Sequence, residues 1–172
     1  MAGERLGNTR TVAWARTVAR PSSTEQKKST MQITRNSLDT NRGPSGWFTG
    51  VVHVDTVAAP SGPSRLSASS VHFTPGSRTA WHTHPNGQTI FVLGGIGLAQ
   101  RRGGPVEVIR PGDRVFFEPG EEHWHGATAT RFMTHLAMLD VDGQGVNATW
   151  GDHVTDEEYA APASTADVPR DR

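Results

Sequence analysis

From Trp47 onward, apolar and polar residues alternate in short runs, and pairs of turn-forming residues separate one run from the next. Two such runs are WFTGVVHVD (47–55) and SASSVHFTPG (67–76), and Pro-Gly, Asn-Gly and Gly-Gly pairs recur at intervals of about 8 to 12 residues. Successive side chains of a strand point to opposite faces, so this alternation is typical of strands that bury one face. The pattern therefore predicts an all-β sandwich or barrel of antiparallel strands.

Helical signals are slight. VTDEEYAAP (154–162) offers Thr155 as a helix N-cap and places acidic residues in the first turn, where they favour the positive end of the helix dipole. Pro162 then ends the pattern. The sequence predicts one short helix here and little helix elsewhere.

The length of 172 residues suits one domain. Residues 1–30 are polar, poor in acids and without a sustained period, so we predict a disordered extension or a mis-assigned start ahead of Met31, with a transit peptide as an alternative. The domain is predicted over 31–162, with its barrel over about 47–142. Residues 163–172 are predicted to form a flexible tail.

Composition narrows the partners. Lysine plus arginine and aspartate plus glutamate number 17 each, so no net charge favours nucleic acid or anionic lipid. No apolar run approaches the length of about 20 residues that spans a bilayer, and no secretory signal is evident. These features predict a soluble, cytoplasmic protein that binds neither nucleic acid nor membrane. Because cysteine is absent, any metal must be held by His, Gln, Asp or Glu.

Two histidine pairs indicate such a metal site. In WHTHPNGQTI (81–90), His82 and His84 share one face of a strand, and a Pro-Asn-Gly turn then brings Gln88 back toward them. In PGEEHWHG, His123 and His125 again share a face. Imidazoles and an amide oxygen suit Mn, Fe, Co, Ni or Zn, whereas Mg and Ca prefer shells made only of oxygen.

The other histidines differ in their surroundings. We interpret His53 and His153 as surface or packing residues, and we expect His72 to face solvent because its neighbours in the strand are apolar. His135 shares a strand face with three apolar residues, Met133, Ala137 and Leu139. Spacing alone leaves two roles open for His135, a hydrogen-bonded core histidine or a general base in a pocket.

These residues resemble the two motifs of the cupin superfamily. The first motif, GxxxxxHxHxxxE with a later glycine, is matched by Gly76, His82, His84, Gln88 and Gly95, with glutamine in place of the glutamate. The second motif is matched by Gly112, Gly120 and His123, with Glu118 at the usual proline and Ala127 at the usual asparagine. The resemblance implies a single-domain cupin β-barrel, a double-stranded β-helix of the jelly-roll type.

A narrower resemblance covers Met31 to Tyr159. The stretches GWFTGVV, PGSRTAWHTHPNGQTIFV, GDRVFFEPGEEHWHGA, MTHLAM and HVTDEEY are similar to small bacterial cupins that include manganese-dependent (R)-selective hydroxynitrile lyases, in which glutamine is usual at the fourth ligand position. The resemblance implies metal ligands at His82, His84, Gln88 and His123, and pocket roles for His125 and His135. It also implies that residues 1–30 lie outside the domain.

A neutral ligand at Gln88 changes the chemistry that a divalent cation can perform. A carboxylate ligand would lower the net charge of the site to +1, whereas three imidazoles and an amide leave it at +2. The additional unit of charge stabilises an anion about 4 Å away by about 4 kcal/mol at an effective dielectric of 20. Such a site favours deprotonation of a bound hydroxyl and attracts small anions. Cyanohydrin cleavage needs both effects, and the resemblance implies this reaction. We therefore predict a lyase that cleaves or forms cyanohydrins, with the metal as Lewis acid and a pocket histidine as base.

The prediction includes a cofactor, a pocket and an assembly. The expected metal is Mn²⁺, with Fe²⁺, Co²⁺, Ni²⁺ and Zn²⁺ as alternatives. Either His125 or His135 is expected to be the base. A largely apolar pocket for a small-molecule substrate is expected from Ser69, Val71, Met133, Ala137 and Leu139. The resemblance implies a homodimer or homotetramer, in which a segment such as residues 31–58 could be exchanged between subunits.

Two other functions remain open at this point. One is an oxygen-activating Fe or Mn dioxygenase, or another metal-dependent cupin reaction on a small carbonyl or hydroxy compound. The other is a non-catalytic protein that binds a metal or a small ligand. Fold alone does not separate these functions, because one fold hosts many chemistries.

Overall fold

The structure is a computed structural model that describes residues 31–35 and 40–161. The chain divides into two units, Met1–Asn36 and Ser37–Arg172, and the strands and the helix of the described residues belong to the second unit. The predictions for residues 1–30 and for the tail from 163 onward lie outside the described residues. Within the described residues, no helix has the length and apolar character needed to cross a membrane.

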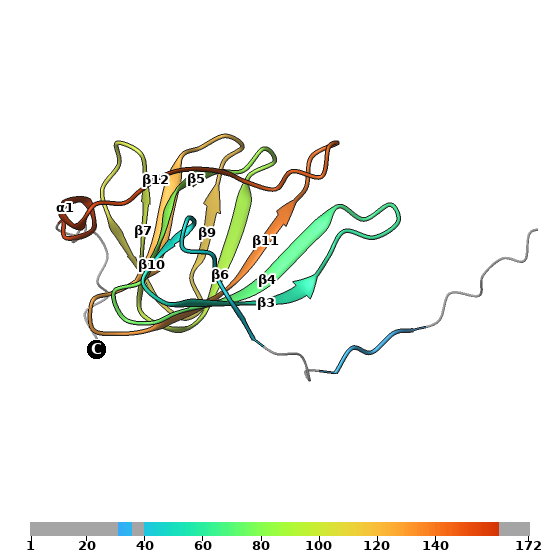
Figure 1. The fold of residues 1–172 in the computed structure, drawn as a ribbon, viewed down its shortest axis with the longest axis horizontal. Coiled ribbons are helices and arrows are strands. Elements are labelled where there is room, and N and C mark those ends of the chain that lie inside the picture. The colour runs from blue at the N-terminus through green and yellow to red at the C-terminus, as the bar shows by residue number, and fades with distance from the viewer. Residues whose placement is uncertain (1–30, 36–39, 162–172) are drawn as a thin grey trace, which may run out of the picture. The chain divides into compact units, whose positions relative to one another are not determined.

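In the part of the chain that the structure describes, twelve short strands build two sheets with antiparallel pairing (Figure 1). The first sheet has the order β1-β3-β4-β11-β6-β9, formed by Asn41–Arg42, Val52–Ala58, Leu66–Phe73, Met133–Asp140, Gln88–Gly95 and Arg114–Phe117. The second has the order β12-β5-β10-β7-β8, formed by Thr149–His153, Arg78–Thr83, His123–Ala127, Gly97–Arg101 and Glu107–Ile109, with β2 (Phe48–Thr49) also paired to β5. The predicted all-β architecture is confirmed.

The core lies between the two sheets, where their alternating apolar residues meet. In β6, Ile90 and Val92 are buried while Phe91 and Leu93 are exposed, as period-two alternation requires. The apolar cluster combines residues of both sheets, among them Val52, Phe73, Ile90, Met133, Ala99, Ile109 and Ala127. Burial of these side chains supplies the hydrophobic stabilisation that holds the sheets face to face.

The turn between β5 and β6 sets the position of Gln88. Gly87 has φ of +76°, and a Cβ at this position would lie 2.7 Å from the carbonyl oxygen of Phe117. Only glycine fits this combination of a left-handed backbone and a close approach. The predicted Pro-Asn-Gly turn therefore forms, and it directs Gln88 into the barrel.

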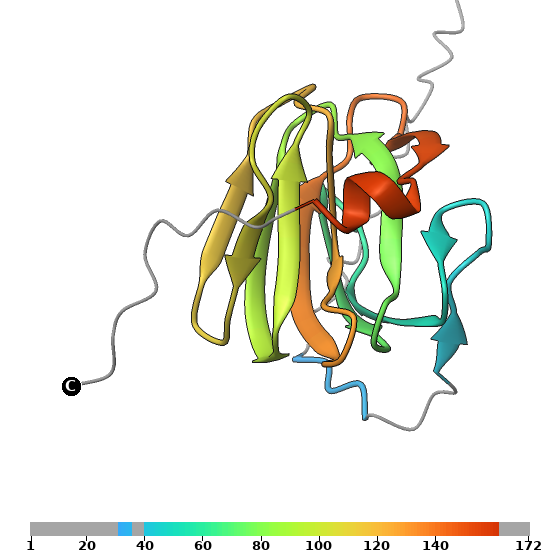
Figure 2. The ribbon, with the colours of Figure 1, turned by 90° about the vertical axis from the view of Figure 1, so that its left-hand side faces the viewer.

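Among residues 31–35 and 40–161 there is one helix, α1 (Asp156–Tyr159), and it begins as the sequence predicts. The Thr155 hydroxyl accepts a hydrogen bond from the Glu158 backbone, and the Glu158 side chain accepts one from the Thr155 backbone, which completes a capping box. Figure 2 shows the helix in front of the strands, on the outer side of the sheet that contains β5 and β10. The hydroxyl of Tyr159 donates to the carbonyl oxygen of Ala127 in β10, which joins the helix to that sheet.

Candidate metal centre

Six polar side chains that the sequence singles out are buried inside the barrel. They come from β5 and the residue after it, from the start of β6, from β10 and from β11, and they are His82, His84, Gln88, His123, His125 and His135. Antiparallel pairing places His123 directly opposite His82, which brings the two histidine pairs together. The register of β5 and β10 therefore brings together two histidine pairs that lie about forty positions apart in the sequence.

Four of these side chains converge. The ring centroids of His82 and His123 lie 4.3 Å apart, and those of His84 lie 5.0 Å from His82 and 5.4 Å from His123. The Oε1 atom of Gln88 lies 3.3 Å from Nε2 of His123. The four residues are the predicted ligand set, and all four are buried.

Backbone carbonyls set the tautomers of three of the histidines. Carbonyl oxygens of Ala80, Asn147 and Glu121 lie 2.9, 2.6 and 2.7 Å from the Nδ1 atoms of His82, His84 and His123. A carbonyl only accepts, so each Nδ1 carries the hydrogen and each Nε2 keeps a free lone pair. This is the orientation found in metal-binding histidines, in which the second ring nitrogen donates to a neighbouring group.

The donors fit a divalent cation. Nε2 of His84 is buried and has no hydrogen-bond partner. With Nδ1 of His123 protonated, its Nε2 and Oε1 of Gln88 are both acceptors and face each other at 3.3 Å. A shared cation satisfies all of these lone pairs, and imidazole and amide donors suit a transition metal.

Ring-nitrogen distances alone select a slightly different group. Among the described residues, His82, His123 and His125 offer ring nitrogens that lie within 4.8 Å of one another. This group contains His125 where the predicted set contains His84. Hydrogen bonding distinguishes the two, because Nδ1 of His84 is bound to a carbonyl and Nδ1 of His125 is not.

His125 and His135 form a pair of their own. Nδ1 of His125 lies 3.2 Å from Nε2 of His135, and the outer nitrogens, Nε2 of His125 and Nδ1 of His135, have no partner. One imidazole must donate to the other, so a proton taken up by one ring is shared with the second. Of the two roles left open for His135, the structure shows a buried histidine with a hydrogen-bond partner, and that partner is itself a site residue.

A cavity of about 280 Å³ opens onto these residues. His82, His84, Gln88 and His125 line it, whereas His123 and His135 do not, so His125 stands between the cavity and His135. Of the predicted pocket residues, Ser69, Val71 and Leu139 line the cavity. Met133 and Ala137 do not line it but belong to the apolar cluster between the sheets, since alternation determines the face of a strand and not the depth along it.

Several cavity residues were not singled out from the sequence. The Trp150 ring stacks on the His82 ring at 4.6 Å and on the Trp47 ring at 5.0 Å, and all three rings are close to parallel. The hydroxyl of Thr79 accepts a hydrogen bond from the backbone of His125 at 3.1 Å and lines the cavity. Trp150 lies outside both histidine motifs, and only its pairing opposite His82 across β12 and β5 reveals its place.

Burial keeps the histidines neutral. It lowers the pKa of His123 and of His135 to about 3, and it lowers the pKa of His84 as well. The pKa of His82 falls well below 6.5 because of burial and then because of the neighbouring His123 and His84, and that of His125 falls because of burial and then His135. At neutral pH the rings therefore present lone pairs rather than positive charge.

The remaining three histidines lie away from this centre. His72 is on the outer face of β4, as its alternation with Val71 and Phe73 predicts, and there its Nδ1 lies 2.8 Å from the Thr134 hydroxyl. Phe132 stacks on it and covers part of its ring. His53 is half-buried opposite His72, and His153 is exposed.

Comparison with known proteins agrees with this architecture. Residues 69–146 match the model of the Cupin_2 family, described as a cupin domain. The chain is 53% identical over 131 residues to the (R)-mandelonitrile lyase of Granulicella tundricola, an alignment that covers 75% of this chain and 98% of that protein.

Solved structures show the same fold. A cupin-like protein from Thermotoga maritima is 35% identical, has a TM-score of 0.66 and matches 73% of this chain and 95% of its own. The polyketide cyclase RemF from Streptomyces resistomycificus, at 16% identity and a TM-score of 0.59, matches 76% of this chain and 91% of its own, and it supports the fold alone. With two antiparallel sheets around a buried histidine cluster, and a relative of 53% identity covered almost completely, this chain belongs to the cupin family.

Proposed function

We propose that this cupin is a metal-dependent lyase that cleaves cyanohydrins to an aldehyde and hydrogen cyanide, or forms them in reverse. One observation carries the proposal. The five buried histidines divide into three whose Nδ1 atoms bind backbone carbonyls and two that bind each other. Similarity to a mandelonitrile lyase supports the same chemistry.

The first group would hold the metal. His82, His84 and His123 would bind through Nε2 and Gln88 through Oε1, with Mn²⁺ proposed and Fe²⁺, Co²⁺, Ni²⁺ or Zn²⁺ as alternatives. When bound, the metal would supply Lewis-acid polarisation of the substrate oxygen. Because all four donors are neutral, the chain itself does not reduce the charge of the ion.

The second group would move the proton. His125 lines the cavity and its Nε2 has no partner, so this atom would accept the proton of the substrate hydroxyl. The electrons of the O–H bond then form the carbonyl, the carbon–carbon bond to the nitrile breaks, and cyanide takes the proton back from His125 and leaves as hydrogen cyanide. In this arrangement Nδ1 of His125 donates to Nε2 of His135, which shares the positive charge while it exists.

The cavity suits an apolar substituent. Val54, Val71, Leu139, Phe48 and Trp47 line it, and these side chains would hold an aryl or alkyl group away from water. The hydroxyl of Thr79 accepts from the backbone of His125, so its own hydrogen is free to donate to the substrate or to the leaving cyanide.

Two parallel assays test this function against the alternatives. Purified protein is stripped of metal, reloaded with Mn²⁺, and supplied with mandelonitrile while benzaldehyde release and oxygen consumption are recorded. We expect benzaldehyde release only from the loaded form and no oxygen consumption, because the reaction is redox-neutral. Oxygen uptake in step with turnover would instead support a dioxygenase, and absence of release from fully loaded protein would contradict the lyase.

A further inference from the structure

The C-terminal segment, residues 147–159, contacts two of the proposed ligands from outside the histidine motifs. Its first residue, Asn147, accepts the Nδ1 hydrogen bond of His84 at 2.6 Å through its backbone carbonyl. Three residues later, Trp150 stacks on His82 with ring centroids 4.6 Å apart and an interplanar angle of 23°. One segment thus orients both histidines of the first pair.

The start of this segment is held by a tight loop. The carboxylate of Asp142 accepts hydrogen bonds from the backbone nitrogens of Gln144 and Val146, both at 2.8 Å. The backbone nitrogen of Asp142 in turn donates to the carbonyl of Val146 at 2.9 Å. These bonds set the direction in which the chain enters Asn147.

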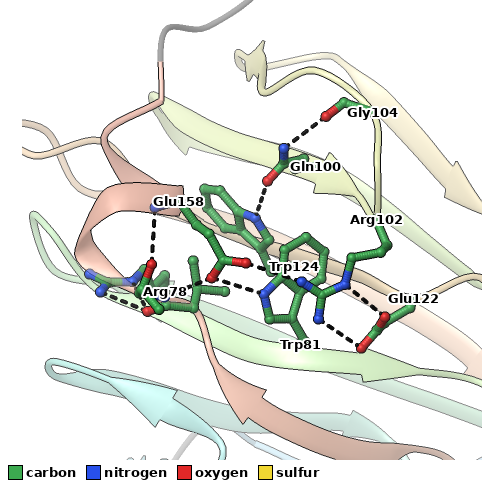
Figure 3. A network of polar contacts seen from close by, with 10 residues as sticks. Arg78, Trp81, Gln100, Arg102, Gly104, Glu122, Trp124 and Glu158 are labelled. Carbon is green, nitrogen blue, oxygen red and sulfur yellow. Dashed lines mark hydrogen bonds and ion pairs between the residues drawn. The ribbon is translucent and has the colours of Figure 1, made fainter.

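The segment ends in α1, which side-chain contacts hold on the outer face of the sheet (Figure 3). Glu158 accepts from the indole nitrogen of Trp81 at 3.3 Å and from Arg102 at 3.1 Å, while the Arg102 guanidinium lies 3.6 Å from the centre of the Trp81 ring. Trp81 precedes the ligand His82 in β5, so the helix is bound to the outer face of the strand whose inner face carries the ligand.

A buried arginine joins the helix to the same strand. Arg78, in β5, donates twice to the carbonyl of Val154 at 2.9 and 3.2 Å and once to the carboxylate of Asp156 at 2.7 Å. Its guanidinium also lies 4.6 Å from the centre of the Tyr159 ring. Arg78 is only 5% exposed, so its two bonds to the buried Val154 form in a poorly solvated place where they are strong, whereas Asp156 is exposed and its ion pair adds less.

We infer that the C-terminal segment positions the metal ligands: Asn147 and Trp150 orient His84 and His82, and the α1 contacts of Glu158 and Tyr159 keep the segment in place. The inference rests on the metal centre of the proposed function. Trp150 and Glu158 are positioning residues, because they act through the ligands. Loss of such an outer partner lowers metal affinity by about 10-fold to 100-fold in known sites.

The test measures Mn²⁺ affinity by calorimetric titration of the full chain. The double variant Glu158→Ala/Tyr159→Ala removes the contacts of α1 with Trp81, Arg102 and Ala127, and Trp150→Ala removes the stacked ring. We expect each variant to raise the dissociation constant for Mn²⁺ at least 10-fold, and we expect Trp150→Phe to keep most of the affinity. Glu157→Ala is the matched control, since Glu157 is exposed in the same helix and shows no hydrogen bond or ion pair. It should bind like the wild type.

Two further readouts separate positioning from loss of stability. Ile109→Ala, in β8 at the opposite end of the sheet order from β12, should lower the melting temperature and leave the affinity unchanged. Long-range proton–nitrogen spectra of the metal-free protein should show His84 protonated at Nδ1 in the wild type and in Glu157→Ala, and a mixture of tautomers in Glu158→Ala/Tyr159→Ala.

Wild-type affinity in folded Glu158→Ala/Tyr159→Ala and Trp150→Ala would overturn the inference, and so would an equal loss of affinity in Ile109→Ala. The outcome is separate from that of the lyase assay. A wild-type protein that binds Mn²⁺ without cleaving mandelonitrile contradicts the lyase only. The Mn²⁺ affinities of the variants then still test whether the C-terminal segment positions the ligands. A wild-type protein that binds no divalent metal overturns both.

Discussion

Gln88 brings a neutral oxygen to a site whose other donors are neutral imidazoles, and it faces the lone pair of His123 at 3.3 Å. Gln88→Glu would keep an oxygen donor in place and add one negative charge. We expect Mn²⁺ to stay bound or to bind more tightly, because opposite charges attract. We expect kcat for mandelonitrile to fall by about 100-fold or more, since the added charge offsets the polarisation of the substrate oxygen. Unchanged kcat at full metal occupancy would show that the neutral charge of Gln88 is not needed for the reaction.

His135 lies behind His125, which gives it a supporting role in proton transfer. His135→Ala removes the acceptor of the His125 Nδ1 hydrogen and the partner that shares its charge. We expect Mn²⁺ stoichiometry to remain that of the wild type and kcat to fall by about 100-fold. Turnover at the wild-type rate in this variant would exclude His135 from the mechanism.

Burial of neutral histidines makes the metal-free protein sensitive to acid. The pKa of His123 and that of His135 fall to about 3, whereas both residues titrate near 6.5 in the unfolded chain. Between these values the unfolded state binds more protons, so the free energy of unfolding decreases as pH falls below 6.5, by about 2 kcal/mol per histidine between pH 7 and pH 5. Urea unfolding of metal-free protein across this range measures the slope.

His135→Asn provides the control for the acid effect. The unfolded state of this variant has one fewer imidazole that can bind a proton. Its free energy of unfolding should therefore depend less steeply on pH than that of the wild type. Equal slopes would mean that His135 is not held neutral in the folded protein.

Spacing in the sequence was enough to predict which histidines share a face of a strand. It was not enough to predict which ring nitrogen of each histidine is protonated or what that nitrogen binds. His82 and His84 alternate along one strand, and that alternation is visible from sequence. The carbonyl that sets the tautomer of His84 belongs to Asn147, 63 residues away, and no local pattern indicates it. Roles that depend on a distant backbone atom could be read only from the folded chain.

The turn before β6 shows how one element positions a site residue. Gly87→Ala would force a Cβ against the Phe117 carbonyl in a left-handed backbone, and we expect the free energy of unfolding to fall by about 1–3 kcal/mol. Gly143→Ala is the matched control, since that position has open space around it and no positive φ, and its free energy of unfolding should be close to that of the wild type. Equal urea midpoints for the two variants would contradict this account of the turn.

At the scale of elements, strands and the short helix could be predicted because their signals are local. Alternation marks the strands, and Thr155 with Glu158 marks the helix start. The pocket could be predicted only in part. Leu139 and Met133 share one face of β11, yet Leu139 lines the cavity and Met133 lies in the core, because depth along the strand depends on how the two sheets pack.

The outer face of the first sheet carries a group of exposed apolar residues, which bears on assembly. Phe91 and Leu93 in β6 are 39% and 52% exposed, and Phe116 in the neighbouring β9 is 49% exposed. Leu136 pairs with Phe91 from β11 on the other side and extends the group. Monomeric proteins rarely expose contiguous apolar patches of large area, so we propose that a second copy of the chain covers this face in a homodimer.

Light scattering coupled to gel filtration tests the assembly. We expect the mass of a dimer or tetramer for the wild type and a smaller mass for Leu93→Glu, because a charge on this face would have to be buried. Val146→Glu, which changes an exposed residue of the loop after β11, outside the group and outside residues 31–58, should leave the mass unchanged. A wild-type mass of one chain would contradict the proposed dimer.

The central claim is that backbone hydrogen bonds divide the five buried histidines into three ligands and a proton-transfer pair. Mn²⁺ bound per chain after equilibrium dialysis, compared between His84→Ala and His125→Ala, tests it most directly. We expect His84→Ala to lose most of its metal and His125→Ala to retain the wild-type stoichiometry. Retention by His84→Ala together with loss by His125→Ala, as ring-nitrogen distances alone would select, would contradict it.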